Sequence, residues 1–314
     1  MTGTIIRRLL SMVPVMAIVA VCVFLLLHLA PGDPAAIIAG DNVTAENIAL
    51  IRARLGLDQP VWKQFIVWVW AMLHGDFGTS MFWGDPVLTL IAQRAAPTLS
   101  LAFTTLVVAV TLSIGMGVLA AARVGTWIDR VVMGISVAGF SVPVFVVGYL
   151  MVFVFAHKLH WLPVQGYRPL SEGVLPWLRN LTMPSIALGL AYVALIARIT
   201  RTTMLEVLAE DYMRTARAKG VGAAPMLLKH ALKNAAVPIA TVIGTGMALL
   251  IGGVVITETV FNIPGIGRLV VDAIARRDYP IIQGVIMISS VDRILRIGRG
   301  ARAERKRSIG GIIR

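Results

Sequence analysis

Between Arg94 and Arg123 the chain reads AAPTLSLAFTTLVVAVTLSIGMGVLAAA, residues 95–122, without a single charged side chain. A helix needs about 20 apolar residues to cross the hydrocarbon of a bilayer. The run is long enough to do so. Because it is continuously apolar rather than alternating, it does not fit a transmembrane β-strand. The stretch therefore predicts a membrane-spanning helix.

Four further runs have the same character: residues 9–30, 131–156, 180–197 and 234–257, of which 180–197 is only just long enough. Hydrophobic residues make up 57% of the chain, charged residues 14%, and the mean hydropathy is +0.82. A soluble domain has about 25% charged residues. The first run is too long for a signal-peptide core and has no small-residue cleavage site before Pro31, so a retained anchor is favoured. We predict an all-α polytopic membrane protein with five full transmembrane helices.

Positive charge predicts the orientation, because Lys and Arg concentrate in cytoplasmic loops. They precede the first run, follow the second and fill the loop after the fourth: Arg7, Arg8, Arg123, Arg130, Arg198, Arg201, Arg214, Arg217, Lys219, Lys229 and Lys233. In the loop after the first run Asp and Glu outnumber Lys and Arg, and the loop after the third run carries only Lys158, Arg168, Glu172 and Arg179. The amino terminus is therefore expected in the cytoplasm. The net charge of +13 follows from this topology and from anionic lipid, and does not indicate nucleic-acid binding.

The loop over residues 198–234 carries a pattern of its own. DYMRTARAKG, residues 211–220, is followed by HALKNAAVP, residues 230–238. Residues 204–219 are compatible with one helix, Gly220 suits a left-handed end, and Pro225 suits the first turn of a second helix. A rigid, bent docking element is predicted.

The spacing within this element separates two faces. Tyr212, Ala216 and Lys219 share one face of the helix, and Arg214 and Arg217 share another. One face is expected to pack, while the other meets acidic groups or phosphates. A solvated hairpin that only obeys the charge rule is the alternative.

The first outside loop is punctuated by helix signals. Thr44 and Gly56 bound a short amphipathic helix, and a tryptophan-rich helix over 61–70 follows Pro60. The second helix is expected either in the headgroup belt or at a partner's surface, and both interpretations stay open.

Glu258 follows the fifth run and precedes a tight turn that Pro264, Gly265 and Gly267 demand. The carboxylate is expected at headgroup level; direct contact with a ligand is the alternative.

The last apolar segment, residues 281–291, is too short to cross a bilayer, and a basic tail over 292–314 replaces its second half. The tail is either an amphipathic surface helix or an out-of-frame translation. We favour the second, and expect such a form to assemble poorly.

Several chemistries find no support in the residues. No Gly-Lys-Ser/Thr P-loop is present, so the chain is not expected to bind or hydrolyse ATP. His157 and His160 lack a third metal ligand, and neither a catalytic nor a metal site is predicted. Cys22 has no CxxC partner and is expected to be a small buried residue.

Seven blocks in register resemble the peptide/nickel subfamily of bacterial ABC-importer permeases. They are PGDP at 31–34, LGLDQP at 55–60, GDFGTS at 75–80, the two blocks of the basic loop, TETVFNIPGIG at 257–267 and DYPIIQ at 278–283. The resemblance runs from the first residues to about residue 290. It implies a type I importer transmembrane domain with a first helix and extracytoplasmic segment over 1–96, a permease core over 97–291 and an atypical tail over 292–314.

The resemblance also implies partners and site residues. The partners are a second homologous permease, two cytoplasmic ATPases that bind the ATP, and a periplasmic solute-binding protein; no cofactor is expected on this chain itself. The basic loop corresponds to the family's ATPase-coupling loop, although the literal Glu-Ala-Ala spelling is absent. Its coupling residues would be Asp211, Tyr212, Arg214, Ala216, Arg217, Lys219, Gly220, His230 and Asn234. A gate-proximal motif would comprise Glu258, Phe261, Pro264, Gly265 and Gly267. The cargo could be a peptide, a nickel chelate or another small solute.

Overall fold

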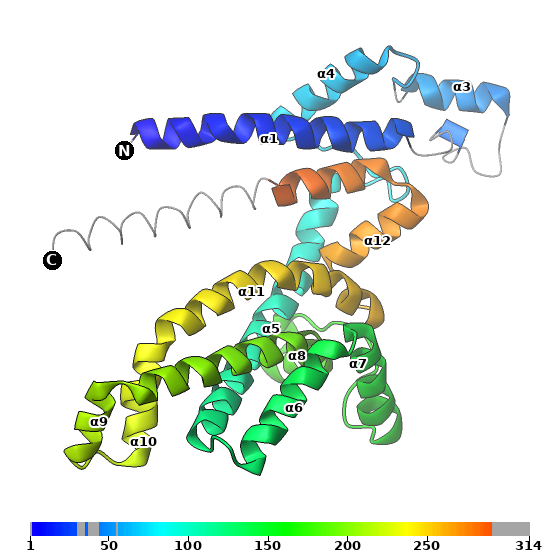
Figure 1. The fold of residues 1–314 in the computed structure, drawn as a ribbon. Helices are drawn as coiled ribbons and strands as arrows, with labels where there is room; N and C mark the ends of the chain where they lie inside the picture. The colour runs from blue at the N-terminus through cyan, green and yellow to red at the C-terminus, as the bar shows by residue number, and fades with distance from the viewer. Residues whose placement is uncertain (1, 30–34, 37–43, 55, 291–314) are drawn as a thin grey trace. The chain divides into compact units, whose positions relative to one another are not determined.

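The computed structural model describes residues 2–29, 35–36, 44–54 and 56–290. These residues are helical almost throughout, and their one β-bridge joins Thr79 to Pro86 (Figure 1). The chain divides into two compact units. One contains residues up to 93 and from 269 onward, and the other contains residues 94–268.

The first unit contains α1 (Thr2–Leu29), α3 (Ala45–Arg54), α4 (Val61–Leu73) and an apolar helix over Tyr279–Ser290. The signals at Thr44, Gly56 and Pro60 are confirmed: α3 and α4 begin directly after Thr44 and Pro60, and Gly56 has a positive φ of 66°. Phe65 and Trp68 of α4 pack on Phe24 of α1. The expected burial of Cys22 is wrong, because its side chain is exposed on α1.

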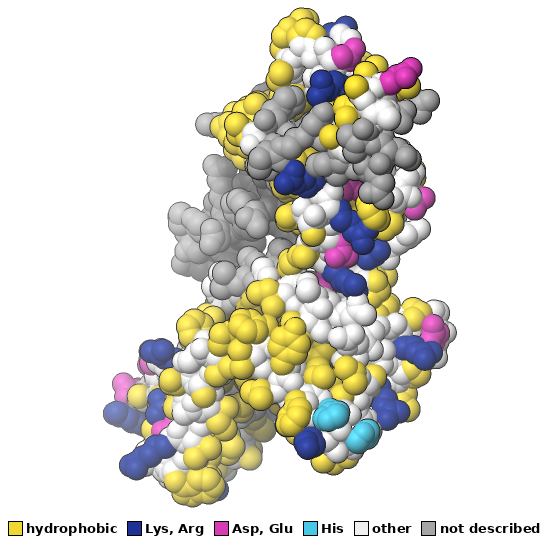
Figure 2. All heavy atoms as spheres, turned by 90° about the vertical axis from the view of Figure 1, so that its right-hand side faces the viewer, with side chains coloured by type: hydrophobic (Ala, Val, Ile, Leu, Met, Phe, Trp, Pro, Cys, Tyr) yellow, Lys and Arg dark blue, Asp and Glu magenta, His cyan; other side chains and the backbone are white. Residues whose placement is uncertain are grey.

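The second unit is built around α8 (Val174–Ala209), which packs against α6 (Trp127–Ser141), α7 (Val144–Met151) and α11 (Leu232–Val260), as Figure 1 shows. The helix α5 (Val87–Ala122) enters this unit from the first, and α12 (Ile266–Arg276) leaves it. One apolar core joins α8 and α11 to α7, and a second lies at the other end of α8. Hydrophobic side chains cover much of the exposed surface, as expected in lipid (Figure 2).

The run over 131–156 is not one straight helix. The helix α6 stops at Ser141, and the next segment, Val144–Lys158, turns away by 106°. Pro143 has no N–H to continue the helix, and Val142 before it is extended, with φ −89° and ψ 126°. The last turns, Val152–Lys158, are π-helical.

Two helices among the described residues, α5 and α8, are long and apolar enough to cross a membrane, and the bent pair adds a third if it is one span. The helix α8 extends well beyond the run over 180–197 at both ends. The count of five full spans and the cytoplasmic amino terminus stay predictions. The tail over 292–314 lies outside the described residues.

Candidate functional site

The basic loop folds into a bent element, residues 210–231, which we call the elbow. The helix α9 (Asp211–Ala218) is followed by a turn, α10 (Ala223–Pro225) and a π-helical segment over Met226–Ala231 that runs into α11. Gly220 takes the predicted left-handed conformation, with φ 81°, and Pro225 lies in the predicted first turn. The helix expected over 204–219 is interrupted, because Glu210 is extended with ψ 148°. The elbow therefore bends at Glu210 as well as at Gly220.

Met213 anchors the elbow to the membrane helices. Its side chain is 1% exposed and belongs to an apolar cluster with Met204 of α8 and Met226 of the π-helical segment. Ala216, one turn later, is half-buried against the same cluster. The prediction of the packing face was therefore right for Ala216 only, because Tyr212 and Lys219 are exposed. The buried contact is made by Met213, which the sequence analysis missed.

The opposite side of the elbow presents its charges to solvent. Asp211, Arg214, Arg217 and Lys219 are all exposed. Arg214 pairs with Asp211 at 3.3 Å, an exposed i,i+3 pair of little energetic weight. His230 is half-buried, and its carbonyl accepts a hydrogen bond from the Asn234 amide at 2.9 Å, within the helix. The predicted coupling residues thus lie within the elbow, except Asn234, which lies in the first turn of α11.

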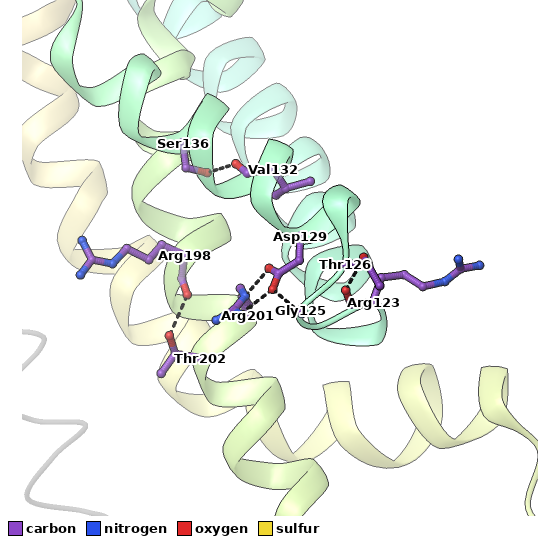
Figure 3. A network of polar contacts seen from close by, with 9 residues as sticks. All are labelled: Arg123, Gly125, Thr126, Asp129, Val132, Ser136, Arg198, Arg201 and Thr202. Atoms are coloured by element: carbon purple, nitrogen blue, oxygen red, sulfur yellow. Dashed lines mark hydrogen bonds and ion pairs between the residues drawn. The ribbon is translucent and has the colours of Figure 1, made fainter.

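A buried ion pair lies beside the elbow's root (Figure 3). Arg201 of α8 donates to Asp129 of α6 through both Nε, at 2.6 Å, and Nη2, at 2.7 Å. The backbone N–H of Gly125 donates to the same carboxylate at 3.0 Å. Asp129 is only 4% exposed. A bidentate pair of this kind fixes the loop over 123–126 to α8.

Both partners lie outside the apolar runs over 131–156 and 180–197. The hydrogen bonds from the Arg201 side chain, and then the one from the Gly125 amide, hold the pKa of Asp129 below its ordinary value. The sequence analysis had used Arg201 only to assign orientation. Asp129 was missed; the available signal was a lone acidic residue in a loop flanked by Arg123 and Arg130.

Glu258 is fully buried, at 0% exposure, which the sequence analysis did not predict; its depth in the membrane stays a prediction. Its carboxylate accepts hydrogen bonds from the Thr98 hydroxyl of α5 at 2.6 Å and from the Arg268 amide at 2.9 Å. Thr98 in turn accepts a hydrogen bond from the Ile266 amide at 2.8 Å. Glu258 and Thr98 thereby satisfy the free amides in the first turn of α12.

The two glycines of the motif make room for this carboxylate. A Cβ on Gly265 would lie 2.0 Å from Glu258 Oε1, and one on Gly267 would lie 2.9 Å from Oε2. Pro264 is half-buried in the same turn. Phe261 is 2% exposed, and its carbonyl accepts a hydrogen bond from Gly166 at 2.9 Å. The motif is a closed structural turn, and its carboxylate has no exposed atom to offer a solute.

Two other recognised blocks also meet in space. Asp278 is buried and accepts hydrogen bonds from the Ser80 hydroxyl and from the amides of Met81 and Phe82, the last two at 3.3 Å. Gly78 reaches its positive φ of 78° within the same turn. The GDFGTS and DYPIIQ blocks, far apart in the sequence, are thus two sides of one contact.

Comparison with known proteins agrees with these features. Residues 113–291 match the family described as binding-protein-dependent transport system inner membrane component, and residues 1–102 match the amino-terminal part of such components. The chain is 56% identical over 286 residues, 91% of each chain, to a probable peptide ABC transporter permease protein, y4tP, of Sinorhizobium fredii (strain NBRC 101917 / NGR234). It is 45% identical over 295 residues, 94% of each chain, to the glutathione transport system permease protein GsiC of Escherichia coli (strain K12).

The fold is likewise similar to a solved structure. A chain of the inward-facing MetNI methionine ABC transporter aligns with a TM-score of 0.50 at 16% identity, over 68% of this chain and 96% of that one. At this identity the likeness concerns the fold alone. The chain described here belongs to the family of binding-protein-dependent transport system inner membrane components.

Proposed function

We propose that this chain is the permease subunit of an ATP-driven importer of peptides or related small solutes. The peptide class rests on the names of relatives that align over nearly the whole chain, a peptide permease and a permease for the tripeptide glutathione. In this proposal the chain pairs with a second, homologous permease and two cytoplasmic ATPases. It receives solute from a periplasmic binding protein, and carries no ATP site of its own.

The elbow is the observation that carries the mechanism. Its exposed side presents Tyr212, Arg214, Arg217 and Lys219, while Met213 fixes its inner side to the cluster shared with α8 and α11. An ATPase that gripped the exposed side would therefore move α8 and α11 with it. Nucleotide binding can then bias one of two packings of the helices, because a ligand shifts only states that already differ in its affinity.

The glycines support helices that approach closely. A Cβ on Gly253 of α11 would lie 2.6 Å from the Leu188 side chain of α8, and one on Gly139 of α6 would lie 3.1 Å from Leu190. Gly134 and Gly244 have no such neighbour among the described residues. Close packing through small residues is the usual basis of helix association in lipid.

Cysteine cross-linking tests the docking directly. In a Cys22→Ser background, Tyr212→Cys of α9 should form a cross-link to a partner ATPase in the purified complex. Leu170→Cys is the matched control: it is also exposed, but lies in the loop between α7 and α8, which the proposal places outside. A cross-link from Leu170→Cys alone would contradict both the docking and the orientation.

The cargo is tested by uptake. Vesicles that contain the whole importer and its binding protein should accumulate labelled tripeptides in the presence of ATP, and not the corresponding free amino acids. Accumulation of a nickel chelate alone would refute the peptide assignment and leave the permease assignment intact.

A further inference from the structure

The pair of Arg201 and Asp129 lies outside the elbow but on the same helix, α8. It joins two segments that are more than 70 residues apart in the chain, at 2.6 and 2.7 Å. Asp129 lies in the first turn of α6, and the Gly125 amide of the preceding loop donates a hydrogen bond to the same carboxylate. Gly125 has a positive φ of 78°, which lets the chain turn sharply into that contact.

The helix α5 is held against the same turn of α8. A Cβ on Gly117 would lie 2.5 Å from Cβ of Thr200 and 2.8 Å from the carbonyl of Ala197. Thr200 is fully buried directly before Arg201. The end of α5, the loop over 123–126 and the start of α6 therefore all rest on this part of α8.

The elbow rests on the next turn of α8. Met204, three residues beyond Arg201, is fully buried in the cluster that contains Met213 and Met226 of the elbow and Ala121 of α5. Two ties thus follow one another along α8: a charged one to α6 and an apolar one to the elbow. A displacement of the elbow acts on α8 within one turn of the ion pair.

We propose that Asp129 and Arg201 are positioning residues: they form a latch that makes α6 and the loop over 123–126 move with α8 when an ATPase displaces the elbow. The inference rests on the proposed docking of the elbow and adds a second route by which its motion reaches the membrane helices. Without the latch, α8 and α11 would still follow the elbow, but α6 would lag behind.

A distance measurement between the loop and α8 distinguishes the latch from an ion pair that only stabilises the fold. Spin labels at Arg123→Cys in the loop and Thr202→Cys on α8, in a Cys22→Ser background, report how the loop sits on α8. Both positions are exposed. The spacing is measured by electron paramagnetic resonance in the whole purified importer, without nucleotide and trapped with ATP and vanadate.

With the latch intact, the spacing should be equal in the two states. In Asp129→Asn and in Arg201→Gln it should shift between them by at least about 2 Å, the scale of helix shifts in such transitions. Arg201→Lys, which keeps the charge but loses the bidentate fork, should give an intermediate shift. Arg198→Gln is the matched control: Arg198 also lies on α8, and Figure 3 shows its guanidinium directed away from Asp129.

Three outcomes would overturn the latch. The first is a spacing that is equal in the two nucleotide states of Asp129→Asn. The second is a spacing that shifts between the two states as much with the intact Asp129–Arg201 pair as in Asp129→Asn. The third is failure of Asp129→Asn to assemble where Arg198→Gln assembles, because the pair would then be a folding contact. The Tyr212→Cys cross-link is scored in parallel. Its absence refutes the proposed docking, whereas its presence together with an unchanged spacing refutes only the latch.

Discussion

At the scale of single residues, buried carboxylates organise this permease. Asp278 accepts hydrogen bonds from a hydroxyl and backbone amides of a segment distant in the chain. Glu258 accepts from the distant Thr98 hydroxyl and from the nearby Arg268 amide, and Asp129 accepts from Arg201 and Gly125. Each carboxylate is itself buried, and these hydrogen bonds offset the cost of removing it from water. These carboxylates thus hold segments of the chain together. Their substitution should lower the stability of the protein more than it changes the recognition of solute.

Gly265→Ala tests the contact at Glu258. The added Cβ would lie 2.0 Å from a fully buried carboxylate that hydrogen bonds from Thr98 and Arg268 hold in place. Overpacking of this kind costs about 1–3 kcal/mol. The variant should melt at a lower temperature than the parent in detergent.

Gly244→Ala is the control, since nothing lies within 4 Å of its Cβ and alanine favours a helix. It should melt at or above the parent's temperature. Equal decreases in melting temperature in the two variants would contradict the idea that the Glu258 carboxylate leaves no room for a side chain at position 265.

The contact at Asp129 predicts a pH dependence. The folded pKa of Asp129 is held below its ordinary value, chiefly by hydrogen bonds from Arg201, so the unfolded chain takes up the proton first as the pH falls. The stabilisation is complete at neutral pH and is lost as the pH drops below the ordinary value of 3.8 towards the folded pKa. The melting temperature of the parent should therefore exceed that of Asp129→Asn at neutral pH, and the gap should close in acid. A gap that is constant with pH would show that Asp129 does not titrate as inferred.

At the scale of elements, α9, the first helix of the elbow, is held at both ends by backbone conformation. Glu210 separates α9 from α8 and Gly220 turns the chain towards α10, while Met213 supplies the one buried side chain of α9. A helix of this length would not be stable alone, so its direction depends on these two bends and this one anchor.

Gly220→Ala should misdirect the elbow. A residue with a Cβ pays about 1–2 kcal/mol in the left-handed conformation, although nothing lies within 4 Å of that Cβ. The variant should therefore retain less ATPase when the complex is purified.

Gly222→Ala is the matched control, because its φ is −64° and its Cβ would meet only Pro225, at 3.9 Å. It should retain ATPase as the parent does. If both variants bound ATPase normally, the direction set at Gly220 would be irrelevant to docking.

At the scale of the whole molecule, the chain is proposed to be one subunit of a larger transport complex. Much of its described surface is apolar, with exposed side chains such as Phe103, Phe140 and Tyr149, and its charged elbow projects from the helices that the second apolar core joins. In the proposed function, ATPases bound to that elbow transmit the energy of ATP binding and hydrolysis to the membrane helices.

Reconstitution tests this dependence. Vesicles that contain this chain alone should not accumulate labelled tripeptide, with or without ATP inside. Vesicles with the complete importer and binding protein should accumulate it in the presence of ATP only. Accumulation by the chain alone would favour a channel or a secondary transporter, and the proposed function would fail.

The resemblance to the family came from blocks spread along the chain, whereas local patterns were enough to identify the membrane class, the helices α3 and α4 and the elbow's turn at Gly220. Each depends on neighbours in the chain: a long apolar run, a glycine free to take a positive φ, or a proline in a first turn. The interactions that determine these features act between residues close together in the chain, so the features can be predicted without knowledge of the fold.

Only the tertiary structure decided which polar side chains are buried and against what. Glu258 and Asp129 look like surface carboxylates in the sequence, and Met213 like any residue of a basic helix, yet all three are buried by segments far away in the chain. The bend of 106° between α6 and the segment after Pro143 also came only from the structure. Burial and bending depend on how whole helices pack, because the stabilising contacts form between segments whose proximity the local pattern does not encode.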